Sequence, residues 1–259
     1  METHEVEHLV SRMDGWLTEK EGVLLYNLAR NCQGKGVIAE IGSWKGKSTI
    51  WLAYGSKQGK NVRIYAIDPH TGSSSHREKY GSIWTFDEFQ KNIRDAGVDD
   101  IITSLVKTSE EAARSHTQPV ELIFIDGAHT YELVKMDFDL WFPKVIEGGI
   151  MAFHDTAYPW GVSPNPASTG PQRVVDKFVY GSRHFRNIRL VDSITIAQKV
   201  KQNSVIDRLS NRCALTLKHL YEKDIKSRLL RKVPKPIKEI GRLMFRTSAQ
   251  KTKAPPNLR

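Results

Sequence analysis

The sequence predicts an α/β fold, a doubly wound and mostly parallel sheet with helices on both faces. Short apolar runs alternate with amphipathic stretches of helical length, as they do when crossover helices join parallel strands. Several runs end in glycine or in polar side chains, at the strand ends where open α/β sheets bind ligands. We expect an N-terminal helical segment at 1–34, this central domain at 35–198 and a basic, mainly helical tail at 199–259.

The first half of the chain supplies three strands of the predicted sheet. Thr18 and Glu21 have the spacing of a capping box, which predicts a helix from Thr18 through about Asn31. The elements predicted after this helix are strands at 37–41, 62–67 and 101–106 and helices at 46–54 and 85–96.

Two apolar runs in the second half, 122–125 and 149–153, flank an amphipathic stretch that Pro143 ends. This reads as strand, helix and strand, which places both strand ends on one edge of the sheet. Asp137 and the other charged residues of the helix are expected on its solvent face. The remaining predictions are a helix at 174–180, strands at 187–190 and 193–198, and pocket-forming loops at 70–83 and 157–172.

The composition excludes several classes of protein. Hydrophobic residues make up 39% of the chain, the mean hydropathy is −0.44, and no apolar run is long enough to span a bilayer. Residues 1–10 lack the apolar core of a signal peptide, so cytoplasmic residence is the default expectation. Cys32 and Cys213 form no CxxC pair, which argues against a disulfide framework or zinc ribbon and favours two free, buried thiols.

A glycine-containing turn joins the first strand to the next helix. Gly42 and Gly46 let its backbone approach a ligand, and the helix start offers free N–H groups. The spacing fits neither a Walker loop nor GxGxxG, and a purely structural turn is the alternative. Asp68 ends the next strand, where an acidic side chain can bind ribose hydroxyls. Thr108 and Ser109, after the third strand, either add hydroxyls at this edge or cap a helix.

Metal-binding and proton-transferring side chains follow the strands at 122–125 and 149–153. Asp126 and Asp155 would repel each other unless a cation or hydrogen-bond donors compensate, and oxygen ligands suit Mg²⁺. His154 also suits a softer divalent ion, and the alternative is a hydrogen bond within the strand end. His129 can accept a proton from a hydroxyl near neutral pH, or it is an exposed residue of a helix start.

Together these motifs resemble the class I S-adenosylmethionine-dependent methyltransferases, which have a Rossmann-like sheet. The closer resemblance is to the branch with macrocin-type sugar O-methyltransferases and cephalosporin-hydroxylase-like proteins, and it covers about residues 15–198. Macrocin-type members often carry an acidic residue where this chain has His154. The matching residues are Gly15-Trp16-Leu17-Thr18, Glu40-x-Gly42-x-x-x-Gly46-x-Ser48, Asp68, Ile125-Asp126-Gly127-x-His129-x-Tyr131-Glu132, Gly148-Gly149 and His154-Asp155-Thr156.

The resemblance implies S-adenosylmethionine and a divalent cation, Mg²⁺, as cofactors. Asp126, His154 and Asp155 would hold the metal, and Asp126 and His129 would be catalytic, with His129 as the base. The implied reaction is O-methylation of a sugar, a glycan or another small molecule with vicinal hydroxyls. A metal oxygenase and a non-catalytic cofactor-binding module in glycan assembly are the alternatives. The implied cofactor-binding residues are Glu40, Gly42, Ser43, Trp44, Gly46, Ser48, Asp68, Ser109 and Asp126.

The net charge of +10 comes from the tail, because residues 199–259 hold 17 basic and 4 acidic side chains against 22 and 25 elsewhere. Residues 203–230 have helical apolar spacing, Pro234 and Pro236 interrupt the pattern, and 237–245 can resume it. A solvated basic helix is the first expectation and peripheral contact with an anionic membrane surface the second. Nucleic acid ranks lower because the tail lacks an aromatic stacking array. A homo-oligomer remains open.

Overall fold

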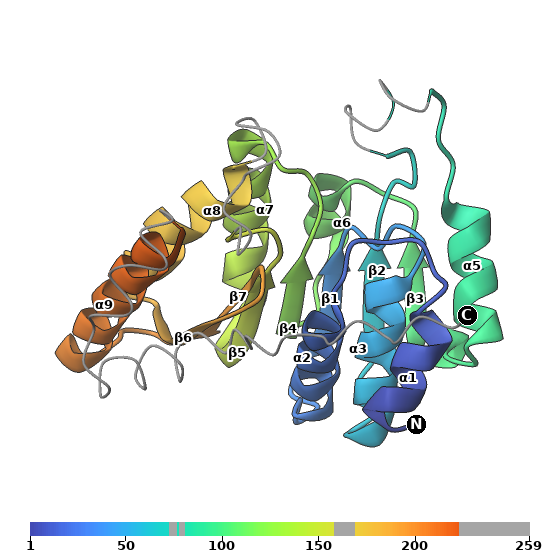
Figure 1. Ribbon diagram of the computed structural model, residues 1–259, viewed down its shortest axis with the longest axis horizontal. Helices are drawn as coiled ribbons and strands as arrows, with labels where there is room; N and C mark the ends of the chain where they lie inside the picture. Colours follow the sequence, from blue (N-terminus) through green and yellow to red (C-terminus); the bar gives the residue numbers. More distant parts are fainter. Residues whose placement is uncertain (73–76, 78–80, 158–168, 223–259) are drawn as a thin grey trace, which may run out of the picture.

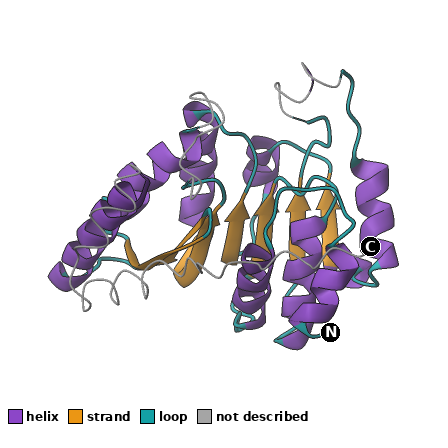
Figure 2. Ribbon diagram, viewed as in Figure 1, coloured by secondary structure: helices purple, strands orange, loops and turns teal. Residues whose placement is uncertain are grey.

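The computed structural model describes residues 1–72, 77, 81–157 and 169–222. A seven-stranded sheet runs through the molecule in the order β3-β2-β1-β4-β5-β7-β6, with helices on both faces (Figures 1 and 2). This confirms the predicted doubly wound architecture. Part of each predicted pocket-forming loop, and the predicted helical stretch at 237–245, lie outside the described residues.

Five parallel strands form the centre and one side of the sheet. The last two strands reverse direction, since β7 is antiparallel to β5 and β6 is antiparallel to β7. The strands are β1 (Val37–Ile41), β2 (Ile64–Ile67), β3 (Ile102–Leu105), β4 (Val120–Ile125), β5 (Val145–Phe153), β6 (Phe185–Val191) and β7 (Ile194–Lys199).

The register aligns the ends of the central strands. Ile125 of β4 pairs with Ile41 of β1 on one side and with Phe153 of β5 on the other. The ladder continues one residue further, because Asp126 N donates to Ile41 O (2.8 Å) and His154 N donates to Ile125 O (3.0 Å). The polar residues after β4 and β5 therefore start from the same edge of the sheet.

Successive residues of the strands point to opposite faces of the sheet and pack in two hydrophobic cores. One core joins Ile38 and Phe124 to α1, α2, α3 and α5. The other joins Ala39 and Ile125 to α6, α7, α8, the π-helix and α9 on the opposite face. The helices are α1 (Thr3–Val10), α2 (Glu19–Arg30), α3 (Lys47–Gln58), α5 (Phe86–Asp95), α6 (Ser109–Ser115), α7 (Tyr131–Trp141), α8 (Gly170–Val174), the π-helix (Val175–Tyr180) and α9 (Val205–Glu222), with short 3₁₀ turns at Asp99–Ile101 and Phe142–Lys144.

Several local predictions need correction. Within the expected N-terminal helical segment at 1–34, bounds were predicted only for the helix after Thr18, and the structure adds α1, which buries Val6 and Val10, one helical turn apart. Asp137 lies on the buried face of α7 rather than in solvent, and burial raises its pKa to about 6. Cys32 is buried as expected, but Cys213 is exposed because it lies on the outer face of α9.

Candidate functional site

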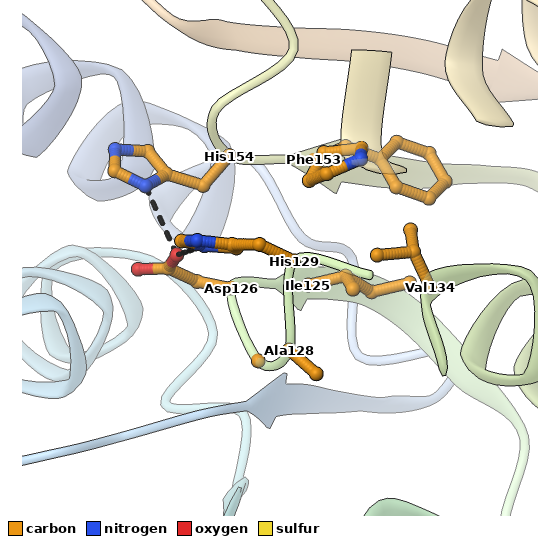
Figure 3. Close-up of a pocket in the computed structure, with 9 residues that line it drawn as sticks. Ile125, Asp126, Ala128, His129, Val134, Phe153 and His154 are labelled. Atoms are coloured by element: carbon orange, nitrogen blue, oxygen red, sulfur yellow. Dashed lines mark hydrogen bonds and ion pairs between the residues drawn. The ribbon is translucent and has the colours of Figure 1, made fainter. Parts of the chain in front are cut away.

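Four titratable side chains from the ends of β4 and β5 converge at the carboxyl edge of the sheet. Asp126 Oδ1 lies 3.0 Å from His154 Nδ1 and 4.0 Å from His129 Nε2. His129 Nε2 lies 3.3 Å from Asp155 Oδ2. Figure 3 shows the imidazoles of His154 and His129 both directed at the Asp126 carboxylate. The predicted convergence of these residues is confirmed.

The cluster is buried on one side and open on the other. His154 is only 4% exposed, whereas the side chains of Asp126, His129 and Asp155 are 25%, 39% and 30% exposed. Asp155 has a φ of 52°, a left-handed conformation that costs about 1 kcal/mol or more in a residue other than glycine. This backbone turn brings its carboxylate within reach of His129. A ligand can therefore approach these three residues while His154 supports them from beneath.

Carboxylates face both nitrogens of His154. Nδ1 lies beside Asp126, and Nε2 lies 3.5 Å from Glu21 Oε2. Burial alone would lower the pKa of His154, but the two carboxylates outweigh it and hold that pKa well above its ordinary value. His154 therefore stabilises Asp126 as an ion pair. The donor atoms of Asp126, His154 and Asp155 also lie within 4.8 Å of one another, a spacing that suits a metal ion.

Glu21 is a member of the site that the sequence analysis did not identify. Its capping box with Thr18 was predicted and is present, but the carboxylate also reaches across the molecule. Glu21 Oε1 accepts hydrogen bonds from the backbone N–H of Ser193 (2.9 Å) and from its hydroxyl (2.7 Å). One buried side chain thus joins α2, the β6–β7 turn and His154. Spacing along the chain gives no signal for partners 172 residues away.

Replacing Glu21 with alanine is expected to lower the free energy of unfolding by about 3 kcal/mol, because buried donors and His154 lose their partner. Glu111 provides the matched control, since it completes an exposed capping box with Thr108. Glu111→Ala should cost only about 1 kcal/mol. Urea unfolding of both variants measures the difference, and equal losses would show that the long-range contacts of Glu21 contribute nothing.

The glycine turn folds against the end of β2. Gly42 has a φ of 86°, and a Cβ atom there would lie 2.2 Å from Asp126 O. Gly46 starts α3 with a φ of 92°. The Asp68 carboxylate accepts hydrogen bonds from Trp44 N (2.8 Å) and His70 N (2.6 Å). The turn therefore lies directly beside the Asp126 cluster, with Asp68 fixing its far side.

Within this turn, Ser43 and Ser48 are buried beneath the surface that the backbone presents. Ser109 begins α6, and its hydroxyl accepts a hydrogen bond from Trp141 Nε1 (2.9 Å), while Thr108 caps the helix. The capping alternative for Thr108 is thus confirmed. Near the end of the predicted loop at 157–172, the chain returns to the site, because the first residue of α8 donates its backbone N–H to His129 O (3.0 Å).

Glu40 is the most deeply buried carboxyl of the turn. It lies on β1 with no exposed surface, and the Thr49 hydroxyl donates to its Oε2. Burial raises its pKa to about 7, although hydrogen bonds from Ser48 and Thr49 oppose the shift.

The raised pKa of Glu40 predicts a pH-dependent loss of stability. The folded protein holds this proton up to about pH 7, whereas an unfolded glutamate releases it near about pH 4.3. The contribution of this proton to the free energy of unfolding is complete below the pKa of Glu40 in the unfolded chain. It is lost as the pH rises through the pKa of Glu40 in the folded protein. The stability of wild type relative to Glu40→Gln should therefore fall by about 3 kcal/mol between about pH 5 and pH 8.

Urea unfolding at both pH values measures the stability change attributed to Glu40. Replacing exposed Glu132 with glutamine controls for the loss of a carboxyl group. A difference between wild type and Glu40→Gln that does not vary with pH would rule out a buried, titrating Glu40.

The part of the chain that holds this site is similar to known proteins. Residues 39–156 match a family model described as a methyltransferase domain. That range begins in β1 and ends just after the cluster at β5, so it contains the glycine turn, Asp68 and all four cluster residues. A curated protein of Sinorhizobium fredii, the uncharacterized protein y4gI, is 46% identical over 37 residues, which cover 14% of this chain and 4% of that protein.

Solved structures share the fold at low sequence identity. The O-methyltransferase TomG from Streptomyces achromogenes, in complex with SAM, is 19% identical with a TM-score of 0.53, over 76% of this chain and 87% of that chain. An O-methyltransferase from Bacillus cereus, in complex with SAH, is 20% identical with a TM-score of 0.52, over 76% and 89%. A protein from Corynebacterium glutamicum is 17% identical with a TM-score of 0.57, over 78% and 90%.

Proposed function

We propose that this chain is an S-adenosylmethionine-dependent methyltransferase of the class I fold. The acceptor we propose is a small molecule with vicinal hydroxyls, such as a sugar or glycan, which is methylated on a hydroxyl oxygen. The observation that carries the proposal is the position of His129. Its Nε2 lies between the Asp126 and Asp155 carboxylates, on the open side of the cluster. A partly exposed imidazole held in this way can accept a proton from a bound hydroxyl.

The glycine turn and Asp68 form the cofactor side of the proposal. Gly42 and Gly46 let the turn pack closely against Asp126 and Phe89, its backbone would face the methionine part of the cofactor, and Asp68 would meet the ribose. Ser43, Trp44 and Ser48 complete the turn. Asp126 lies against Gly42, so it would border both the cofactor and the acceptor.

The chemistry requires little more than placement and removal of a proton. The sulfonium methyl group is already activated, so the protein has to bring a hydroxyl oxygen in line with it. The new carbon–oxygen bond forms as the sulfur–carbon bond breaks, the sulfur keeps the bonding electrons, and the hydroxyl proton passes to His129 Nε2. Burial would lower the pKa of His129, but Asp126 and Asp155 raise it above its ordinary value, which keeps the accepted proton in place.

The donor set also supports metal assistance. Asp126 and Asp155 would supply carboxylate oxygens to Mg²⁺, and His154 would be the third donor once a bound cation displaced the proton that it shares with Asp126. A bound divalent cation would lower the pKa of a coordinated hydroxyl and accept two neighbouring hydroxyls of one acceptor. In this arrangement His129 remains available for the proton because it lies on the exposed side of the carboxylates.

Transfer of labelled methyl groups tests the proposal. The enzyme is incubated with labelled S-adenosylmethionine and pairs of methyl glycosides that differ only in one vicinal hydroxyl, with Mg²⁺ or with EDTA. We expect transfer to the diols, at least about a hundredfold less to the deoxy partners, and loss with EDTA. Equal transfer with Mg²⁺ and with EDTA would rule out the proposed role of a metal ion. No transfer to any hydroxylated acceptor would rule out the proposed function.

A further inference from the structure

Helix α9 presents an apolar stripe to solvent in addition to the face that it packs against the protein. Its buried positions include Asn211, Ala214 and Lys218, which fall on one side of the helix. The opposite side carries the outward stripe, defined as Val205, Ile206, Leu209 and Leu220, which are 61%, 78%, 57% and 45% exposed. The solvent face of α9 therefore exposes apolar side chains, mainly in its first turns, beside polar residues such as Arg212 and Thr216.

Three arginines border one end of this stripe. Arg208 and Arg212 of α9 and Arg183 from the turn before β6 line a cavity of about 290 Å³, together with Tyr180, Gly181 and Ser182. None of the arginines has a carboxylate within ion-pair distance among the residues that the structure describes. Arg208 donates only to the backbone carbonyl of Asn203 (3.0 Å) among its hydrogen bonds to described residues. The cavity therefore offers guanidinium groups to an external anion.

The cavity lies away from the catalytic cluster. Its residue Arg183 lies two positions before Phe185, where β6 begins, and β6 runs parallel to β5 because both are antiparallel to β7. His154 and Asp155 follow the opposite end of β5. Helix α9 is also the outermost element on this side of the sheet (Figure 1). A surface could bind here without covering the site at the carboxyl edge.

We propose that α9 binds an anionic phospholipid surface, with a lipid phosphate in the arginine cavity and Val205, Ile206 and Leu209 in the interfacial layer. Apolar side chains beside arginines on one exposed helix face are the pattern of a helix that lies in a membrane interface. The charge of the tail favours the same partner, because residues 199–259 carry 17 basic and 4 acidic side chains. Within the described part of the chain, no helix is long and apolar enough to cross a membrane.

Vesicle co-sedimentation of the full chain tests this inference. Vesicles of phosphatidylserine mixed with phosphatidylcholine should bind the protein, and vesicles of phosphatidylcholine alone should not. Val205→Ser/Ile206→Ser/Leu209→Ser keeps every charge, and Arg183→Gln/Arg208→Gln/Arg212→Gln keeps the stripe. Each triple variant should bind the anionic vesicles at least about tenfold more weakly. Both should bind S-adenosylmethionine as wild type does.

A charge-matched control distinguishes binding through the α9 arginines from nonspecific electrostatic attraction of the basic tail to the vesicles. Arg63→Gln/Arg94→Gln/Lys107→Gln removes the same charge from exposed positions on other elements and should bind vesicles as wild type does. The inference fails if this control weakens binding as much as the α9 arginine variant, or if the stripe variant binds normally. It also fails if wild type does not bind anionic vesicles. Finally, it fails if sedimentation velocity shows that two copies of the chain associate through the stripe.

Discussion

Asp126→Asn is expected to reduce methyl transfer at least about a thousandfold while the dissociation constant for S-adenosylmethionine changes less than about threefold. The substitution keeps the shape and the backbone contacts of the residue but removes the charge that faces His154 at 3.0 Å and His129 at 4.0 Å. His129 then loses a group that orients it and stabilises its protonated form. Labelled-methyl assays and calorimetric titration of the cofactor measure the two effects separately.

Asp139→Asn is the matched control for Asp126→Asn. Asp139 lies in the last turn of α7, where it is exposed and pairs with Lys135 one helical turn away, so its variant should retain full transfer. Thermal unfolding of both variants checks that each is folded under the assay conditions. Full transfer by folded Asp126→Asn would remove this residue from the catalytic machinery.

Gly42→Ala should destabilise the protein by about 3 kcal/mol or more and abolish cofactor binding. Two costs act together at this position. The φ of 86° is a left-handed conformation, and the new Cβ atom would lie 2.2 Å from the backbone oxygen of Asp126. Relief of that contact has to separate the ends of β1 and β4, which moves the turn and the acidic cluster at once.

Gly97→Ala separates the two costs. Gly97 also has a positive φ, 63°, but a Cβ atom there would meet nothing within 4 Å. Its alanine variant should lose only about 1 kcal/mol and should bind the cofactor normally. Urea unfolding and cofactor titration of both variants test this. Similar losses of stability would show that the close approach of Gly42 to Asp126 does not account for the destabilisation of Gly42→Ala.

Local patterns in the sequence were sufficient to predict the sheet and the central cluster. The apolar runs before Asp126 and His154 and the helix between them fix the direction of both strands. Parallel pairing then brings these residues to one edge whatever the detailed packing. The same reasoning placed Gly42 and Asp68 correctly, because each directly follows a strand whose apolar pattern is unambiguous.

Long-range contacts account for what could not be predicted. Glu21 was identifiable as a helix cap, but its bonds to Ser193 depend on how the β6–β7 turn meets α2. Asp137 has the sequence context of a surface residue, and only the packing of α7 against the sheet buries it. Lys218, in a stretch expected to be solvated, is fully buried and pairs with Asp176 of the π-helix.

Mass spectrometry of the methylated product tests the central claim most directly. Wild type and His129→Ala are compared with isotopically labelled S-adenosylmethionine and a vicinal-diol acceptor, and fragmentation locates the label. We predict a labelled methyl group on a hydroxyl oxygen with wild type, and a yield at least about a hundredfold lower with folded His129→Ala. A label on nitrogen or carbon, or an undiminished yield from His129→Ala, would contradict hydroxyl activation at this site.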